Sequence, residues 1–285
     1  MSDNSTRTAE GRVWLITGTS AGFGRAIAEA ALAAGDTVIA TARKPEALDD
    51  LAAAYPGRAV PVALDVTDPA RITDVVAEAL LWYGRIDVLV NNAGRGHLGA
   101  VEETSDDELR SLMDLHVYGP ANLIRAVLPH MRSQGSGAIV QLSSMGGRMS
   151  FPGVGAYSAT KFALEGLSVA LAAEVAPHGI DVMIVEPSAF RTSFAGGAQT
   201  VSAPIDAYAA TVGPFRTAFP DSDGSQPGDP AKAAAAILEA LAAERVPLRL
   251  VLGNTAIDAI AANLEAQAGE LAEWEHLSRA MEFDA

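Results

Sequence analysis

The stretch LITGTSAGFGRAIAEA, residues 15–30, decides the fold. It continues an apolar run, 13–17, that is typical of a buried strand, and it opens an Ala-rich amphipathic segment, about 23–34, that predicts a helix. The turn between them is rich in glycine, which permits a close approach of main chain to phosphate, and a helix N-terminus offers free N–H groups to an anion. The candidate pyrophosphate-binding residues are Gly18, Ser20, Gly22, Phe23 and Gly24.

The same alternation of short β-branched runs and longer Ala-rich runs continues along the chain. Further strands are predicted at 37–41, 59–64, 86–90, 137–142, 179–185 and 247–252, and further helices near 69–82, 105–132, 156–176, 230–243 and 255–280. Strands that are apolar on both faces and alternate with helices indicate a parallel sheet covered on both sides. We therefore expect an α/β fold with a doubly wound, Rossmann-like sheet of about seven strands, which binds ligands beyond the carboxyl ends of its strands.

The 285 residues are expected to form a single domain, 1–285, with a core at about 12–252. Residues 189–229 lack clear periodicity and are rich in Gly, Pro, Ser and Ala, which leaves two interpretations open: a loop that covers the substrate or a disordered surface excursion. Residues 254–285 form a C-terminal helical extension that either packs over the active site or alters assembly.

Composition excludes several classes of function. The formal charge of −15 argues against nucleic acid and anionic membranes as partners, because both require clustered Lys and Arg. The chain has no cysteine, and its five histidines show no ligand-like pairing, so no metal site is predicted. A polar N-terminus and the lack of any long apolar run predict a soluble, cytoplasmic protein.

The residues after the second strand indicate which dinucleotide binds. An acidic side chain near this point holds the ribose 2′-hydroxyl of NAD, whereas an arginine suits the 2′-phosphate of NADP. Here Ala42 takes the place of the acid, and Arg43 and Lys44 follow it. A solvated basic turn is the alternative, but two adjacent cations in so acidic a chain favour NADP(H).

Three motifs occur in order on this one chain: the glycine pattern, NNAG at 91–94, and a tyrosine and a lysine four positions apart at 157 and 161. Together they resemble the short-chain dehydrogenase/reductase family over about residues 12–252. The resemblance implies the strand order 3-2-1-4-5-6-7 and a nicotinamide cofactor across the strand ends. By the same resemblance, the adenine would contact Asp65 and Val66, the cofactor would be flanked by Asn92, Ala93 and Gly94, and its carboxamide would meet the segment from Pro187 to Thr192.

The tyrosine and the lysine suggest the chemistry. Tyr157 and Lys161 share one face of a predicted helix, and a nearby cation is expected to lower the pKa of a phenol, which is ordinarily about 10. Tyr157 would then move the proton while Lys161 tunes it and, by resemblance, binds the nicotinamide ribose. Two serines end the fifth strand, and Ser144 matches the family's catalytic serine better than Ser143 does, with the role of orienting the substrate oxygen.

One position departs from the family pattern. His116 stands where the family carries an asparagine that holds a water connecting the lysine to solvent. Three roles stay open for His116: a catalytic substitute that holds the same water, a tolerated structural replacement, or a sign of impaired chemistry.

The substrate side is predicted to be mainly apolar. Candidate pocket walls are Met145, Met149, Phe151, Phe194 and Tyr208, and the entrance is assigned to Arg95, Gly96 and His97. Such a pocket suits a ketone, an aldehyde or a secondary alcohol with a hydrophobic body. The helix at 156–176 is apolar nearly all round, which indicates a subunit contact and a homodimer or homotetramer.

The leading interpretation is an NADP(H)-dependent oxidoreductase of the carbonyl reductase type, which transfers a hydride between nicotinamide and a carbonyl or secondary alcohol carbon. Two alternatives remain: a cofactor-binding sensor or scaffold protein without turnover, and an epimerase or dehydratase that retains NAD.

Overall fold

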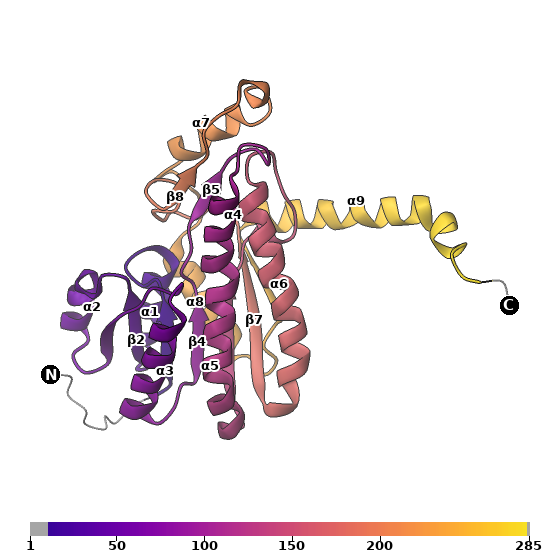
Figure 1. Cartoon of the computed structure of the whole chain (residues 1–285). Helices are drawn as coiled ribbons and strands as arrows, with labels where there is room; N and C mark the ends of the chain where they lie inside the picture. The colour runs from indigo at the N-terminus through magenta and orange to yellow at the C-terminus, as the bar shows by residue number, and fades with distance from the viewer. Residues whose placement is uncertain (1–10, 284–285) are drawn as a thin grey trace.

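A computed structural model describes residues 11–283 and contains a seven-stranded parallel sheet (Figure 1). Its strands run in the order β3-β2-β1-β4-β6-β7-β9, which is the predicted order once the seven are counted along the chain. Their bounds are β1 Val13–Thr17, β2 Thr37–Ala42, β3 Ala59–Ala63, β4 Val88–Asn91, β6 Gly137–Leu142, β7 Ile180–Pro187 and β9 Arg249–Leu252. The doubly wound, Rossmann-like fold is confirmed.

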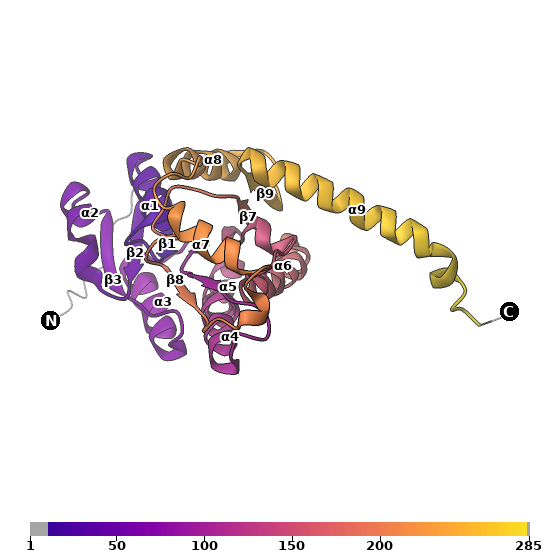
Figure 2. The ribbon, with the colours of Figure 1, turned by 90° about the horizontal axis from the view of Figure 1, so that it is seen from above.

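Helices cover both faces of the sheet, as the view from above shows (Figure 2). Alternate residues of β1 face opposite cores, because side chains along a strand alternate: Leu15 packs with Val75 and Leu123, and Ile16 packs with Ile27 and Ile237. Burial of each such aliphatic side chain contributes about 1.5–3 kcal/mol. The helices are α1 Gly22–Ala33, α2 Asp49–Ala54, α3 Pro69–Tyr83, α4 Asp106–Met113, α5 Gly119–Gln134, α6 Gly155–Val175 and α8 Pro230–Ala242.

The single helix predicted at 105–132 is divided in the structure. A capping box of Ser105 and Glu108 starts α4, and a π-helical segment at 114–118 joins it to α5. Pro120 has no backbone N–H, so it cannot donate the hydrogen bond that a regular α-helix would continue with at this junction. At Gly119 the helix passes so close to the loop after β3 that an added Cβ would lie 2.7 Å from the Val66 carbonyl oxygen.

The region 189–229 contains regular structure that its sequence did not predict. The strand β8, Gln199–Val201, pairs in parallel with β5, Gly96–Leu98, and the helix α7 spans Gly213–Asp221. In Figure 1 these elements lie above the carboxyl ends of the main sheet. The side chain of His97 fastens the small sheet through Thr200 (Nδ1 to Oγ1, 2.9 Å) and Ser202 (Nε2 to Oγ, 3.0 Å).

The last helix, α9 Asn254–Arg279, projects away from the body of the protein (Figures 1 and 2). Only its first turns are anchored, by buried Ala256 and Ile260 and by a hydrogen bond from Asn263 Nδ2 to the Arg148 carbonyl (3.0 Å). Beyond them its apolar side chains Leu271 and Trp274 are exposed. Within residues 11–283, none of the helices has the length and apolar character needed to cross a bilayer.

Candidate active site

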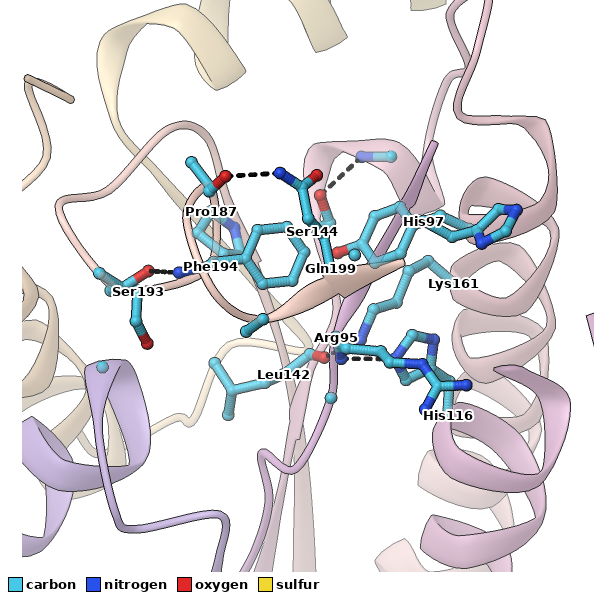
Figure 3. Close-up of a pocket in the computed structure, with 18 of the residues that line it drawn as sticks. Arg95, His97, His116, Leu142, Ser144, Lys161, Pro187, Ser193, Phe194 and Gln199 are labelled. Atoms are coloured by element: carbon cyan, nitrogen blue, oxygen red, sulfur yellow. Dashed lines mark hydrogen bonds between the residues drawn. The ribbon is translucent and has the colours of Figure 1, made fainter. Parts of the chain in front are cut away.

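A cavity of about 1180 Å³ lies at the carboxyl ends of the strands, under the small sheet and α7. Figure 3 shows a close-up of the residues around it. All of the residues predicted to bind the cofactor line it, except Gly24, which lies beneath the glycine loop: they are Gly18, Ser20, Gly22, Phe23, Arg43, Asp65, Val66, Asn92, Ala93, Gly94, Tyr157, Lys161, Pro187 and Thr192.

The glycine loop forms a cradle whose shape depends on glycine. Gly18 (φ +70°) and Gly22 (φ +58°) adopt left-handed backbone conformations. A Cβ on Gly24 would collide with the Gly18 carbonyl oxygen and with Asn92 Nδ2. The Asn92 amide holds the loop by donating to the carbonyl oxygens of Thr17 (2.8 Å) and Gly18 (3.0 Å). No side chain of the described residues caps the N-terminus of α1. The cradle therefore fits the pyrophosphate of a dinucleotide.

The rim next to β2 and β3 fits the adenosine end. Arg43 is exposed there, directly after the buried end of β2, and Asp65 and Val66 lie beside it. Burial by itself would raise the pKa of Asp65, but hydrogen bonds from Thr67 and the charge of Arg43 lower it overall. The charge of Arg43 therefore acts at this rim of the cavity.

Tyr157 and Lys161 lie on α6, and Ser144 follows β6, so two elements bring the three side chains to one part of the cavity. Desolvation raises the pKa of Tyr157 to about 12, and a hydrogen bond with Ser144 only partly opposes this. Desolvation thus outweighs the lowering expected from the Lys161 charge, and the pKa of the phenol lies above its ordinary value of about 10. The lysine Nζ lies 5.7 Å from the ring centroid of Tyr157 and donates to the Leu142 carbonyl (2.8 Å).

The two neighbouring serines have different surroundings. Both line the cavity, and the Oγ of Ser144 accepts a hydrogen bond from the Gly146 amide (3.0 Å). The buried Ser143 instead donates to Glu165 Oε1 (2.8 Å), so its hydroxyl is committed to the protein interior. The geometry favours Ser144 over Ser143 as the group that faces a substrate.

Glu165 belongs to a buried ionic network that the sequence did not indicate. Arg249 Nε lies 3.3 Å from Glu165 Oε2 and 3.0 Å from Glu186 Oε1, and Arg148 Nη1 lies 3.2 Å from Glu186 Oε1. Burial, reinforced by the charge of Glu186, raises the pKa of Glu165 to about 7. The available signal was its position four residues after Lys161 on the same helix face.

Lys161 is only 6% exposed, and burial lowers its pKa to about 8. The charge of Glu165 opposes this effect and favours the ammonium form. The protonation state of Lys161 at neutral pH thus depends on the balance between desolvation and the neighbouring carboxylate.

His116 has both ring nitrogens occupied by the protein. Its Nε2 accepts a hydrogen bond from the Arg95 amide (3.1 Å), and its Nδ1 lies 2.8 Å from Thr160 Oγ1. The Thr160 hydroxyl donates to the Tyr157 carbonyl (2.7 Å), so the Nδ1 of a neutral ring is the donor to Thr160. Burial, and then the charges of Lys161 and Arg95, lower the pKa of His116 well below its usual value. This geometry corrects the hypothesis that the imidazole holds a water, because no ring nitrogen is left for one, and it favours the structural replacement.

The substrate half of the cavity agrees with the predicted walls only in part. Met145, Phe151 and Phe194 line it, as do the entrance residues Arg95, Gly96 and His97. Met149 does not line it, and Tyr208 lines a separate small pocket, where its hydroxyl contacts Glu102. The residues that sequence reasoning missed come mostly from the region without periodicity: Gln199, Phe215, Phe219 and Gln226.

Residues 12–201 match the short chain dehydrogenase family. This chain is a short-chain dehydrogenase/reductase. It is 42% identical over 270 residues to the oxidoreductase BOA17 of Botryotinia fuckeliana, a match that covers 94% of this chain and 98% of that protein. A solved short-chain dehydrogenase from Streptomyces avermitilis is 60% identical with a TM-score of 0.92, covering 96% of this chain and all of that one (100%).

A solved short chain dehydrogenase from Burkholderia cenocepacia in complex with NADP is 29% identical, with a TM-score of 0.72 and coverage of 93% of this chain and 97% of that one. Structures of the same fold have been solved with NADP and also with NAD. The family therefore establishes an oxidoreductase, while the choice between the two dinucleotides has to be argued from this chain's own residues.

Proposed function

We propose that this short-chain dehydrogenase/reductase is an NADPH-dependent reductase of ketones or aldehydes with a mainly apolar body, and that it oxidises the corresponding alcohols in reverse. The observation that carries the proposal is the convergence of Ser144, Tyr157 and Lys161 on a cavity that also contains the glycine cradle. When bound, the nicotinamide dinucleotide supplies the hydride for the carbonyl carbon.

The side chains supply the remaining chemistry. Tyr157, with a pKa of about 12, stays protonated at neutral pH and donates its proton to the carbonyl oxygen as that oxygen gains negative charge. The Ser144 hydroxyl orients the same oxygen and stabilises the developing charge. The ammonium group of Lys161, held by the Leu142 carbonyl, stabilises the phenolate that remains after the proton has left.

Arg43 supports the preference for NADPH. No acidic side chain stands at the end of β2 to bind a free ribose hydroxyl, since position 42 is a buried alanine. The exposed guanidinium of Arg43 at the rim matches a phosphate, which arginine binds with two parallel hydrogen bonds.

The proposal is tested by following NADPH consumption with a panel of apolar ketones and aldehydes. Wild-type protein is expected to turn over at least one of them, and Tyr157→Phe is expected to lose about 100-fold or more in kcat, because general acid catalysis contributes 10²–10⁴-fold. A fluorescence titration of NADPH against the variant is the control that the site still binds cofactor. Binding without any turnover by the wild type would instead support a sensor or scaffold, and NAD retained through purification would support an epimerase or dehydratase.

We further propose that the protein is a homo-oligomer that associates through α6. This helix exposes the apolar side chains of Phe162, Leu167 and Val169, although its other face packs against the sheet. Apolar surface of this kind is typical of a subunit contact. Light scattering of the full chain measures its mass in solution, and a monomer would contradict the proposal.

A further inference from the structure

The strand β8 fixes the direction of the Gln199 side chain. In the β5–β8 ladder Gln199 lies opposite Gly96, and Thr200 lies opposite His97, to which its hydroxyl is bonded. Because side chains alternate along a strand, Gln199 leaves β8 on the face opposite to that of Thr200. Gly96 leaves room there: a Cβ on it would lie 3.3 Å from Gln199 Cβ and 3.3 Å from the Phe194 ring.

The amide of Gln199 has one occupied end and one free end. Its Nε2 donates to the Ala195 carbonyl (2.5 Å), and this bond fixes the orientation of the amide, because a carbonyl oxygen cannot donate. Its Oε1 is buried and has no hydrogen-bond partner among the described residues. An unpaired buried acceptor costs about 1–3 kcal/mol, so a small rotation of the side chain that lets a ligand in the cavity donate to Oε1 is favoured.

An aromatic wall connects this amide to the reacting groups. The Phe194 ring lies beside Gln199 and 5.8 Å from the ring of Tyr157. It also lies 6.4 Å from Phe219, which packs 5.2 Å from Phe215 on the same face of α7. All of these rings line the cavity, and Figure 3 shows Phe194 and Gln199 among its lining residues. A planar apolar body fits such a wall.

A second glutamine provides a useful contrast. Gln226 also lines the cavity, and its buried Oε1 has no hydrogen-bond partner within residues 11–283. It lies two residues before Gly228, which bridges to Phe190, and Phe190 packs 5.0 Å from Phe23 of the glycine loop. Gln226 therefore belongs to the half of the cavity next to the cradle, and Gln199 belongs to the substrate half.

We propose that Gln199 selects the substrate: its Oε1 accepts a hydrogen bond from a hydroxyl or N–H on a planar, apolar ketone, or on the corresponding alcohol, at a position other than the carbon that Tyr157 and Ser144 serve. This inference rests on the proposed reductase function and adds to it a requirement for a second polar group on the substrate.

The test compares two pairs of ketones that differ in one hydroxyl group: 2-hydroxyacetophenone with propiophenone, and 3′-hydroxyacetophenone with 3′-methylacetophenone. For wild-type protein with NADPH, the hydroxy ketone of at least one pair is expected to have about a 10-fold higher kcat/KM, as one hydrogen bond of about 1.4 kcal/mol provides. In Gln199→Met, which keeps the side-chain size but has no oxygen, this ratio is expected to fall to near 1.

Thr200→Val is the matched control. It weakens the attachment of the same strand through His97 but leaves the Gln199 amide in place, so the ratio is expected to persist. Ketone turnover with a ratio near 1 in the wild type, a ratio unchanged in Gln199→Met, or an equal loss in Thr200→Val overturns the assignment of Gln199. If none of the four ketones is reduced although another ketone or aldehyde of the panel is, the assignment of Gln199 is overturned; if nothing in the panel is reduced, the proposed function itself is contradicted.

Discussion

Replacing Glu165 with glutamine is predicted to move the basic limb of the pH–rate profile to lower pH. Glu165 and Lys161 lie one helical turn apart on α6, and both are nearly buried (4% and 6% exposed). Burial lowers the pKa of Lys161 to about 8, and the Glu165 carboxylate is what keeps it from falling further. Glu165→Gln keeps the shape of the side chain and removes that charge.

The size of the effect follows from the separation. Side chains at i and i+4 have Cβ atoms about 5–6 Å apart, and opposite charges at about 6 Å attract by about 3 kcal/mol at an effective dielectric of about 20. Arg249 also pairs with this carboxylate, so we take about half to all of that attraction as acting on Lys161. Its loss in Glu165→Gln lowers the pKa of Lys161 from about 8 to about 6–7. At pH 7.5 the charged fraction of Lys161 then falls from about three-quarters to roughly 3–25%, a loss of roughly 3- to 25-fold in rate.

The sign is set by the direction in which lysine titrates: its charge, and with it the activity, is lost as pH rises through its pKa. The assay is kcat/KM for NADPH between pH 5.5 and 9.5, because this parameter reports the pKa values of the free enzyme. Ser143→Ala is the graded comparison, since it keeps the carboxyl group of Glu165 but removes a hydrogen bond that lowers its pKa, so the basic limb is expected to move in the same direction by less than in Glu165→Gln. Superimposable profiles for Glu165→Gln and wild type, or an equal displacement in Ser143→Ala, would refute the reasoning.

Two further predictions concern single residues. Arg43→Ala is expected to raise the KM for NADPH by about 10- to 100-fold and to change that for NADH little, because a hydrogen bond to a charged group contributes about 1.5–3 kcal/mol; an unaltered ratio of the two KM values would remove Arg43 from the phosphate site. His116→Asn is expected to keep most of the activity and to leave the profile between pH 6 and 8 unchanged, because the low pKa of the buried imidazole keeps it neutral there. An acid limb near pH 6.5 that disappears in this variant would show that the histidine titrates during catalysis.

The sheet and the cofactor end could be predicted from the sequence because local signals dominate there. Short β-branched runs that are apolar on both faces set the strands, and the glycines at 18, 22 and 24 have a local steric reason. The tyrosine–lysine spacing placed both side chains in one cavity, since a helix fixes i and i+4 on one face.

What could not be predicted depends on contacts between distant segments. The strand β8 is only 3 residues long and owes its existence to β5, about a hundred positions away in the sequence. The spacing of Tyr157 and Lys161 gave their proximity but not their solvation, and desolvation decides the pKa of each. The hydrogen-bond partners of His116 are the Arg95 amide and the Thr160 hydroxyl, which lie in other parts of the chain. The sequence around position 116 does not indicate them.

Two different parts of the chain form the cavity, and the short ladder between β5 and β8 lies where they meet. The strand ends carry the groups that move a proton and hold a dinucleotide, whereas Phe194, Gln199 and the aromatic face of α7 reach the same space from a segment with few ties to the sheet. We therefore expect that segment to be exchangeable without loss of the sheet. Transplanting it between family members is a route to retargeted reductases whose redox core is left untouched.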